Sequence, residues 1–340
     1  MHIAHVTLAK KLGGGEMQQR LLMQALAEYP IEQSLICPSH MQDFFRDKPI
    51  ANLNNIESTE GLFTRHCKIN ADIYHAHCGR SIYWCLIEKL LTKKPYIATR
   101  RVPEPVKARW SSRLAYGQAH KIVAITQAVA NQLPNYIPKD NITICHSALA
   151  QNFQAKPPSR TINTHSPQIL QIGNLLTHKG YQTTFECAQK LAKTHPNITI
   201  TILGERRDPN ISAQIDQHAN INYVGVVDDP TPYYQQADLF IFPSWDEGMG
   251  SSLLEAMNHA LPLIASQVGG IPEVIKHNQT GLLIPPQSSD ALYDNILWML
   301  DNPDQAQQLG LNGHNRLYQF LPQAMADTYF NIYQECLSQN

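Results

Sequence analysis

Residues 246–285 read DEGMGSSLLEAMNHALPLIASQVGGIPEVIKHNQTGLLIP and carry the strongest structural signals of the chain. A short apolar run before them, Leu239–Phe242, predicts a strand. The glycine- and serine-rich turn that follows leads into apolar residues at helical spacing over 251–259, and the next apolar run, Leu261–Ala265, predicts another strand. Strand, turn, helix and strand in this order are typical of a parallel sheet with helices on its faces.

The same alternation extends outward in both directions. In the first half, the sequence predicts strands at 2–8, 34–37, 71–77, 96–99, 121–125 and 141–145, and helices at 16–28, 82–91 and 127–133. In the second half, it predicts further strands at 168–172, 198–203 and 221–224, and helices at 180–194, 211–218, 230–236, 288–300, 303–318 and 322–338. Strands separated by helices in both halves predict two α/β domains, each with a doubly wound parallel sheet.

A polar stretch with three prolines, residues 150–167, separates the two series of elements. We therefore expect an N-terminal domain over 1–155, a linker over 156–167, a second domain over 168–320 and a closing segment over 321–340. A chain of 340 residues suits two domains of ordinary size. Ligands of such sheets bind at the carboxyl ends of the strands, so a cleft between the domains is the expected site.

Composition places the chain among ordinary folded proteins. Of its residues, 43% are hydrophobic and 16% are charged, which argues against a disordered chain. No apolar run reaches the ~18 residues that a membrane-spanning helix needs. The opening MHIAHVTLA lacks a basic region, so it predicts a strand rather than a signal peptide. The seven cysteines form no C-x-x-C pair, as expected of reduced thiols in the cytoplasm.

The net charge of −1 hides a strong asymmetry between the two halves. Residues 1–160 contain 20 Lys and Arg against 11 Asp and Glu, whereas residues 161–340 contain 7 against 17. Such a division predicts that the two halves face different partners. It is not the uniformly basic composition of a general nucleic-acid binder, so we expect no nucleic-acid partner.

The turn after Leu239–Phe242 has the composition of an anion-binding loop. Glycines and serines at 248–252 open a helix, and the amide groups of a helix N-terminus bind phosphate together with the positive end of the helix dipole. Glu255, about one turn further, is placed to accept ribose hydroxyls, and Glu247 to accept sugar hydroxyls. The alternative is an ordinary helix start, with Ser251 as its cap and Glu255 as a capping-box acid.

With these residues in place, the stretch 246–285 resembles the signature of the family 4 glycosyltransferases, which have the GT-B fold. The resemblance rests on two glutamates with seven residues between them and on short motifs in a fixed order: Glu247 and Glu255, Glu255-Ala256-Met257, Ala260-Leu261-Pro262, Gly269-Gly270-Ile271-Pro272-Glu273-Val274 and Thr280-Gly281-Leu282-Leu283. It extends over most of the chain through Gly13-Gly14-Gly15-Glu16, Ile172-Gly173, Lys179-Gly180 and the helix at 322–338.

The resemblance implies two Rossmann-like domains that face each other across a cleft, with the C-terminal helix crossing back to the N-terminal domain. It implies a nucleotide-diphosphate sugar on the second domain, an acceptor on the first, and transfer that retains the anomeric configuration without a metal or other cofactor. Lys179 and Glu247 would be catalytic, because Lys179 would neutralise the leaving diphosphate; a solvated turn lysine is the alternative. The donor-binding residues would be Gly14, Gly173, Asn174, Arg206, Gly248, Met249, Gly250, Ser251, Ser252 and Glu255.

Two positions depart from the family pattern. Many relatives have an arginine where this chain has Asn174, which leaves the second phosphate-binding cation open. Arg206 or Arg207 would supply it, with a surface placement as the alternative. Many relatives also have a histidine after the strand that ends near Thr99, and this chain has Arg101 there. We expect the acceptor side to be lined by Glu16, His77, Arg100 and Arg101.

Basic residues gather over 88–121, where nine stand against two acidic ones, with Trp110 and Tyr116 among them. A basic, partly aromatic helix binds anionic membrane surfaces. The same charges would also suit phosphate or carboxylate groups of an acceptor, and a solvated basic face is the third interpretation. His75 and His77 share one face of a strand, at a spacing that suits a metal. No third ligand is evident, so we expect His77 to line the cleft and no metal to bind.

We therefore predict a cytoplasmic, retaining glycosyltransferase that moves a hexose from a nucleotide-diphosphate sugar to a hydroxyl of a glycan or glycolipid. The expected setting is the synthesis of lipopolysaccharide or another bacterial cell-surface polysaccharide. Its partners would be the donor, the acceptor and, through residues 88–121, the cytoplasmic face of the inner membrane. The alternatives are a sugar-nucleotide epimerase of related fold and a non-catalytic protein that binds a glycan or nucleotide.

Overall fold

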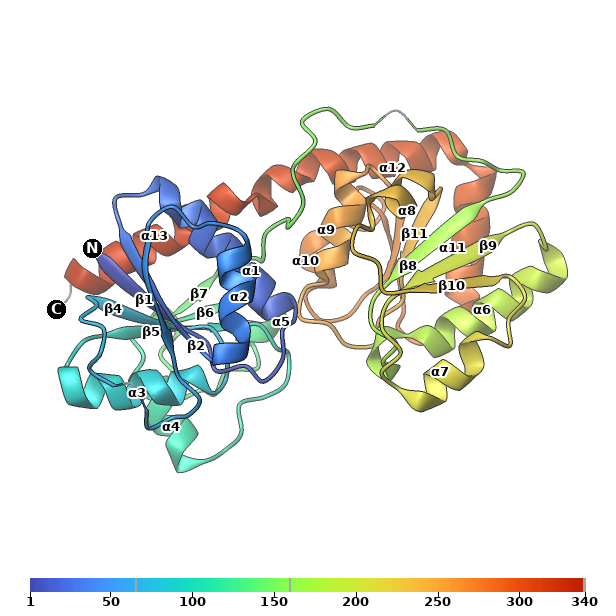
Figure 1. Cartoon of the computed structure of the whole chain (residues 1–340). Helices are drawn as coiled ribbons and strands as arrows, with labels where there is room; N and C mark the ends of the chain where they lie inside the picture. Colours follow the sequence, from blue (N-terminus) through green and yellow to red (C-terminus); the bar gives the residue numbers. More distant parts are fainter. Residues whose placement is uncertain (65, 159, 339–340) are drawn as a thin grey trace. The chain divides into compact units, whose positions relative to one another are not determined.

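The computed structural model describes residues 1–64, 66–158 and 160–338. The chain divides into two compact units. Unit 1 comprises Met1–Ala150 and Phe320–Asn340, and unit 2 comprises Gln151–Gln319. Each unit contains one parallel sheet with helices packed against it (Figure 1). The predicted fold class, two Rossmann-like domains with doubly wound parallel sheets, is confirmed.

Unit 1 has a seven-stranded sheet in the order β3-β2-β1-β4-β5-β6-β7. Its strands are β1 (His2–Val6), β2 (Glu32–Cys37), β3 (Leu53–Ser58), β4 (Ile73–Ala76), β5 (Tyr96–Arg100), β6 (Lys121–Ala124) and β7 (Ile142–Ile144). Its α-helices are α1 (Gly14–Ala25), α2 (Gln42–Asp47), α3 (Ser81–Thr92), α4 (Trp110–Gly117), α5 (Gln127–Ala130) and α13 (Pro322–Ser338). The strand order reverses between β1 and β4, so the carboxyl ends of these two strands form the topological switch point.

Unit 2 has a six-stranded sheet in the order β10-β9-β8-β11-β12-β13. Its strands are β8 (Gln168–Ile172), β9 (Thr199–Leu203), β10 (Ile221–Gly225), β11 (Leu239–Phe242), β12 (Leu263–Ser266) and β13 (Leu282–Ile284). Its α-helices are α6 (Tyr181–Thr194), α7 (Pro209–Ile215), α8 (Thr231–Gln236), α9 (Ser251–Asn258), α10 (Ile271–Val274), α11 (Ser289–Asp301) and α12 (Pro303–Arg316). Its switch point lies between β8 and β11.

Helix α13 belongs to unit 1 although it follows unit 2 in the chain (Figure 1). Its apolar face is buried in one cluster with residues of β1, β4, β5 and β6. Two of its tyrosines also make buried hydrogen bonds: the Tyr333 hydroxyl lies 2.7 Å from His75 Nδ1, and the Tyr329 hydroxyl 2.7 Å from Thr99 Oγ1. The helix expected at 322–338 is present, and residues 339–340 of the expected closing segment lie outside the described residues.

The expected linker, residues 156–167, is anchored to unit 2 in its described part. The Arg160 guanidinium donates to three main-chain carbonyl oxygens, those of Tyr234, Ala237 and His259. Ile162 is buried in the core of the same unit. The polar composition of this segment is therefore explained by its hydrogen bonds to the ends of helices in unit 2. Ser159 lies outside the described residues. The division between the units falls after Ala150.

The basic stretch 88–121 does not form one basic helix, because the strand predicted at 96–99 interrupts it as β5. It comprises the end of α3, strand β5, an irregular segment and α4. Pro95, Pro103 and Pro105 explain the breaks, because proline lacks the amide hydrogen that a helix interior needs. No helix among the described residues is long and apolar enough to cross a membrane.

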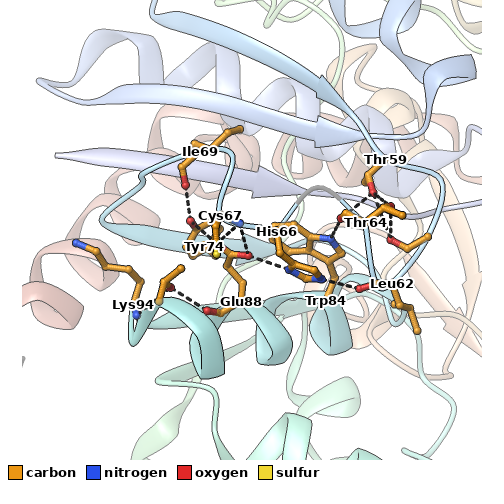
Figure 2. A network of polar contacts seen from close by, with 12 residues as sticks. Thr59, Leu62, Thr64, His66, Cys67, Ile69, Tyr74, Trp84, Glu88 and Lys94 are labelled. Atoms are coloured by element: carbon orange, nitrogen blue, oxygen red, sulfur yellow. Dashed lines mark hydrogen bonds and ion pairs between the residues drawn. The ribbon is translucent and has the colours of Figure 1, made fainter.

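A buried carboxylate holds the segment that precedes β4 (Figure 2). Glu88, on α3, accepts hydrogen bonds from the Cys67 amide at 3.1 Å, the Tyr74 hydroxyl at 3.0 Å and His66 Nδ1 at 2.8 Å. The His66 ring stacks on Trp84 with 4.5 Å between the ring centroids. The described residues of this segment are therefore fixed to α3 by side-chain bonds.

Replacing Glu88 with alanine should destabilise unit 1. The Cys67 amide and His66 Nδ1 would lose their acceptor, whereas the Tyr74 hydroxyl keeps the Ile69 carbonyl oxygen as an acceptor. We expect a cost of about 1–3 kcal/mol in the free energy of unfolding. Urea unfolding measures this loss. Glu28 is exposed, and Glu28→Ala is the matched control, expected to change the same free energy by less than about 0.5 kcal/mol. Equal stability of the two variants would contradict this role of Glu88.

Candidate functional site

Two loops meet at the switch point of unit 2. The first follows β8 and ends in a 3₁₀ turn, Thr177–Lys179, and the second follows β11. Gly180 has φ +72°, and a Cβ there would lie 1.8 Å from the Pro243 carbonyl oxygen, so only glycine permits this approach. The Trp245 amide donates to the His178 carbonyl at 2.7 Å. The two loops are thus joined through their backbones.

This junction brings together the two side chains that the sequence singled out as catalytic. Lys179 Nζ lies 2.5 Å from Glu247 Oε2, and the side chains are 22% and 16% exposed, respectively. The ammonium group also lies 5.5 Å from the centroid of the Phe242 ring. A Cβ on Gly173 would lie 3.8 Å from Lys179 Cδ, which places Gly173 beside the lysine stem. Lys179 is therefore an ion-paired, half-buried cation at the strand ends.

The backbone of Glu247 is fixed by a third loop, which follows β12. Gly269 has φ +51°, and a Cβ there would lie 1.8 Å from the Glu247 carbonyl oxygen. The Gly270 amide donates to the same oxygen at 3.2 Å. This part of the motif at 246–285 therefore has a mechanical role, because the glycines let one loop close onto another.

Helix α9 begins at Ser251, and Gly250 is its N-cap residue with φ +85°. No side chain caps this N-terminus, so the capping role considered for Ser251 is not seen. A Cβ on Gly250 would lie 2.9 Å from the Phe242 ring, the ring that Lys179 also approaches. The Met249 side chain is buried and contributes to packing. Lys179 and the positive end of α9 thus flank one aromatic ring.

Glu255 faces a hydroxyl rather than the start of its own helix. Its Oε2 accepts a hydrogen bond from the Tyr234 hydroxyl at 2.9 Å. Burial raises the pKa of Glu255, and this hydrogen bond partly opposes the increase. Tyr234 is itself held by stacking on His259, with 5.1 Å between the centroids. Among the described residues, the other carboxylate oxygen has no hydrogen-bond partner, so it can accept ligand hydroxyls.

The residues expected to replace the missing second cation are engaged elsewhere. Asn174 Oδ1 accepts from the Glu205 amide at 3.2 Å. Arg206 pairs with Asp216 at 2.7 Å and lies over the Tyr223 ring. Arg207 pairs with the Glu205 carboxylate at 2.5 Å in the same loop. Their positive charges are therefore balanced by neighbouring carboxylates.

The switch point of unit 1 gathers three of the four residues expected on the acceptor side. Helix α1 starts at Gly14, and a Cβ on Gly15 would lie 3.8 Å from Arg101 Cδ. Arg101 Nη1 donates to the His77 carbonyl at 3.0 Å. Glu16 is buried beside them: burial raises the pKa of its carboxyl group, and the charge of Arg101 lowers it.

Arg100 lies apart from this group. Its side chain is buried, and its guanidinium donates to the Tyr116 hydroxyl at 3.1 Å and to the Glu104 carbonyl. Successive side chains of a strand point to opposite faces, and Arg100 is the last residue of β5. Arg101, the next residue, is therefore free to take the other direction.

A third histidine joins the pair that the sequence identified. His5 lies opposite His75 in the pairing of β1 with β4, and suitable nitrogens of His5, His75 and His77 lie within 4.8 Å of one another. Each ring nitrogen has a polar neighbour: His75 contacts Thr99 and Tyr333, and His5 contacts His77 and Gln33. Sequence reasoning missed His5 because strand register was needed to find it. The cluster is a hydrogen-bonded core whose nitrogens are already engaged.

The close approach of Gly269 to Glu247 predicts a sharp effect of a small substitution. Gly269→Ala should displace the loop that carries Glu247 and lower stability by about 2 kcal/mol or more, since both the positive φ and the collision oppose the new Cβ. Thermal unfolding measures this. Gly117, at the end of α4, has open space where a Cβ would lie, so Gly117→Ala should leave the melting temperature within a degree or two. A Gly269→Ala protein as stable as wild type would refute the constraint.

Comparison with known proteins finds a family match in the second half of the chain. Residues 152–316 match the family model of the glycosyl transferases group 1. An uncharacterized glycosyltransferase of Haemophilus influenzae is 24% identical over 56% of this chain and 54% of its own length. The D-inositol 3-phosphate glycosyltransferase of Corynebacterium glutamicum is 23% identical over 81% of this chain and 75% of its own length. The chain thus spans about half of the first relative and three quarters of the second.

Solved structures share the fold of the whole chain. The Anabaena protein HepE, solved in complex with UDP and glucose, covers 98% of this chain and 100% of its own, with a TM-score of 0.79 and 14% identity. At that identity the likeness supports the fold alone. The match over 152–316, about half of the chain, agrees with the predicted resemblance to the glycosyltransferases.

Proposed function

Residues 152–316 match the glycosyl transferases group 1, and we propose that the chain transfers a hexose, with retention, from a nucleotide-diphosphate sugar to a hydroxyl of a glycan or glycolipid. The observation that carries this proposal is the Lys179–Glu247 pair beside the uncapped N-terminus of α9. A cation and a helix N-terminus at one switch point suit a diphosphate. The carboxylate paired with the lysine suits sugar hydroxyls.

The donor is held by residues of unit 2. Glu255 accepts the ribose hydroxyls through the oxygen that Tyr234 leaves available. Lys179 and the amides at Ser251 and Ser252 bind the diphosphate, and Glu247 accepts hydroxyls of the transferred sugar. When the donor enters, its phosphate oxygens compete with Glu247 for Lys179. The ion pair therefore keeps both groups oriented before binding and releases them for the ligand.

Catalysis in this proposal is electrostatic. The bond between the anomeric carbon and the diphosphate oxygen breaks, and the negative charge that develops on that oxygen is stabilised by Lys179 and the end of α9. The acceptor hydroxyl oxygen bonds to the anomeric carbon on the same face, and its proton passes to a donor phosphate oxygen. These groups supply the charge stabilisation without a metal or other cofactor.

The acceptor binds to unit 1 at Glu16, His77 and Arg101 in this proposal. An anionic acceptor fits the basic character of residues 1–160, and one relative is named for a phosphorylated acceptor, inositol 3-phosphate. Lipopolysaccharide or another bacterial cell-surface polysaccharide has the matching chemistry, with phosphate and carboxylate groups among its sugars.

Contact with the cytoplasmic face of an anionic membrane is the second part of the proposal. Helices α3 and α4 are joined by the Lys89 ammonium, which donates to the Gln118 carbonyl at 2.7 Å. They expose apolar side chains among their basic residues: Leu90 at 59%, Leu91 at 58%, Trp110 at 81% and Leu114 at 39%. Exposed tryptophan and leucine next to lysine and arginine are typical of surfaces that bind anionic membranes.

Lys179→Ala and Glu255→Ala should each nearly abolish transfer while the fold persists. Loss of Lys179 removes charge stabilisation worth about 10²–10³ in rate, and loss of Glu255 removes the ribose contact. The readout is release of the nucleoside diphosphate. The donor is chosen first by thermal shift with UDP-, GDP- and ADP-sugars, because a ligand at 100 times its Kd adds about 2.7 kcal/mol of stability.

Lys193 provides the matched control. It is exposed in the last turn of α6, on the same helix that Lys179 precedes. Lys193→Ala should release nucleoside diphosphate at the wild-type rate. Full activity in Lys179→Ala or in Glu255→Ala would remove that residue from the site, and a wild-type protein that releases none would refute glycosyl transfer itself.

Binding to membranes is tested by sedimentation with vesicles. The wild-type protein should sediment with phosphatidylglycerol vesicles at low salt, and much less with phosphatidylcholine vesicles or at 0.5 M salt. Trp110→Ser with Leu114→Ser should lower the bound fraction several-fold. Val226 is 71% exposed in unit 2, so Val226→Ser is the control and should bind as wild type. Equal sedimentation of all variants would contradict the membrane contact.

A further inference from the structure

Arg101 is a cation at the switch point of unit 1 that pairs with no carboxylate of the described residues. Its Nη1 donates to the His77 carbonyl at 3.0 Å, and its Nη2 lies 3.5 Å from His77 Nδ1. Its Nε is buried and has no hydrogen-bond partner in the described part of the chain. Among the described residues, no carboxylate lies within ion-pair distance of this guanidinium, whereas Arg206 and Arg207 in unit 2 are both paired.

A chain of hydrogen bonds fixes the side of His77 that faces Arg101. Gln33 Nε2 donates to the Met23 carbonyl at 2.8 Å, so Gln33 Oε1 must accept from His5 Nε2 at 2.9 Å. His5 Nδ1 then carries the lone pair and accepts from His77 Nε2 at 2.9 Å. This leaves His77 Nδ1 as an acceptor directed at Arg101.

The chain of bonds stays in this arrangement over the neutral pH range. Burial lowers the pKa of His5 to about 3, and burial together with the neighbouring imidazoles lowers the pKa of His77 well below its usual value. Both rings are therefore neutral and keep one donor and one acceptor each. One edge of the Arg101 guanidinium is held by this acceptor and by the His77 carbonyl.

The remaining donors of Arg101 are the ones that a ligand would use. A guanidinium has five N–H groups in a rigid fork, and two of them face His77. A buried Nε–H without a partner costs free energy that an incoming acceptor would recover. Carboxylates and phosphates match the fork with two parallel hydrogen bonds. Glu16 lies nearby and cannot serve in this way, because no oxygen of its carboxylate is within ion-pair distance.

We infer that Arg101, oriented by the His77–His5–Gln33 chain, is an oxyanion-binding residue of unit 1 that takes a phosphate or carboxylate group of a substrate. The role of this anion as part of an acceptor or a donor rests on the proposed function. Two sources carry the same chemistry: a charged group on the acceptor sugar and the diphosphate of the donor. The neighbouring Glu16 carboxylate would repel an isolated anion, but it accepts hydroxyls, so the pair suits an anionic sugar better than inorganic phosphate.

Isothermal titration calorimetry of the full chain tests this assignment with three probes: glucose 6-phosphate, UDP and uncharged glucose. Arg101→Gln should weaken the binding of one of the two anions at least tenfold. Arg101→Lys, which keeps the charge and loses the fork, should give an intermediate loss. Arg46→Gln removes an exposed arginine of α2 and should bind as wild type. The affinity for uncharged glucose should be the same in the wild type and in all variants.

Each outcome decides the inference. A loss confined to glucose 6-phosphate assigns Arg101 to an acceptor group, and a loss confined to UDP assigns it to the donor diphosphate. Unchanged affinity of Arg101→Gln for both anions, or no measurable binding of either anion to the wild type, overturns the inference. Release of nucleoside diphosphate is measured on the same samples. Arg101-dependent binding without any release would refute glycosyl transfer and leave the anion site standing.

Discussion

The Glu247 carbonyl oxygen is the point on which the geometry of unit 2's switch point depends. It lies so close to Gly269 that no Cβ fits between them, and it accepts the Gly270 amide. A second tight approach, that of Gly180 to Pro243, sets the position of Lys179. Two backbone contacts thus bring a lysine and a glutamate from different loops within 2.5 Å. The ion pair therefore follows from the contacts between the loops at the strand ends.

The order of the strands and helices and the position of the two glutamates could be predicted from the sequence, because both depend on residues that are close together in the chain. Glu247 and Glu255 lie on one loop and the helix that it opens, so their spacing alone places them together. The order of strands and helices predicted two parallel sheets for the same reason. The strands that sequence reasoning missed, β3 and β13, are both edge strands. Partial exposure weakens the apolar signal of β3, whereas β13 is buried but only three residues long.

The parts that could not be predicted depend on register and direction. His5 reaches His77 because β1 pairs with β4 in one particular register, which no motif encodes. Arg100 and Arg101 are adjacent, yet one is buried against Tyr116 and the other meets His77, because the strand ends between them. Arg206 was expected as a substitute cation, and its pairing with Asp216, ten residues further on, is not indicated by any motif. The contacts of these residues depend on partners that are distant in the sequence, and residue type alone does not indicate them.

The path of the chain has a consequence for the order in which the molecule is made. Unit 2 is continuous from Gln151 to Gln319, whereas unit 1 is split, and its last piece is α13. During synthesis, unit 2 can complete its sheet while unit 1 still lacks the tyrosines that bond His75 and Thr99. Until then the apolar surface of β1, β4 and β5 under α13 stays uncovered. The half that is translated first is therefore the half that finishes folding last.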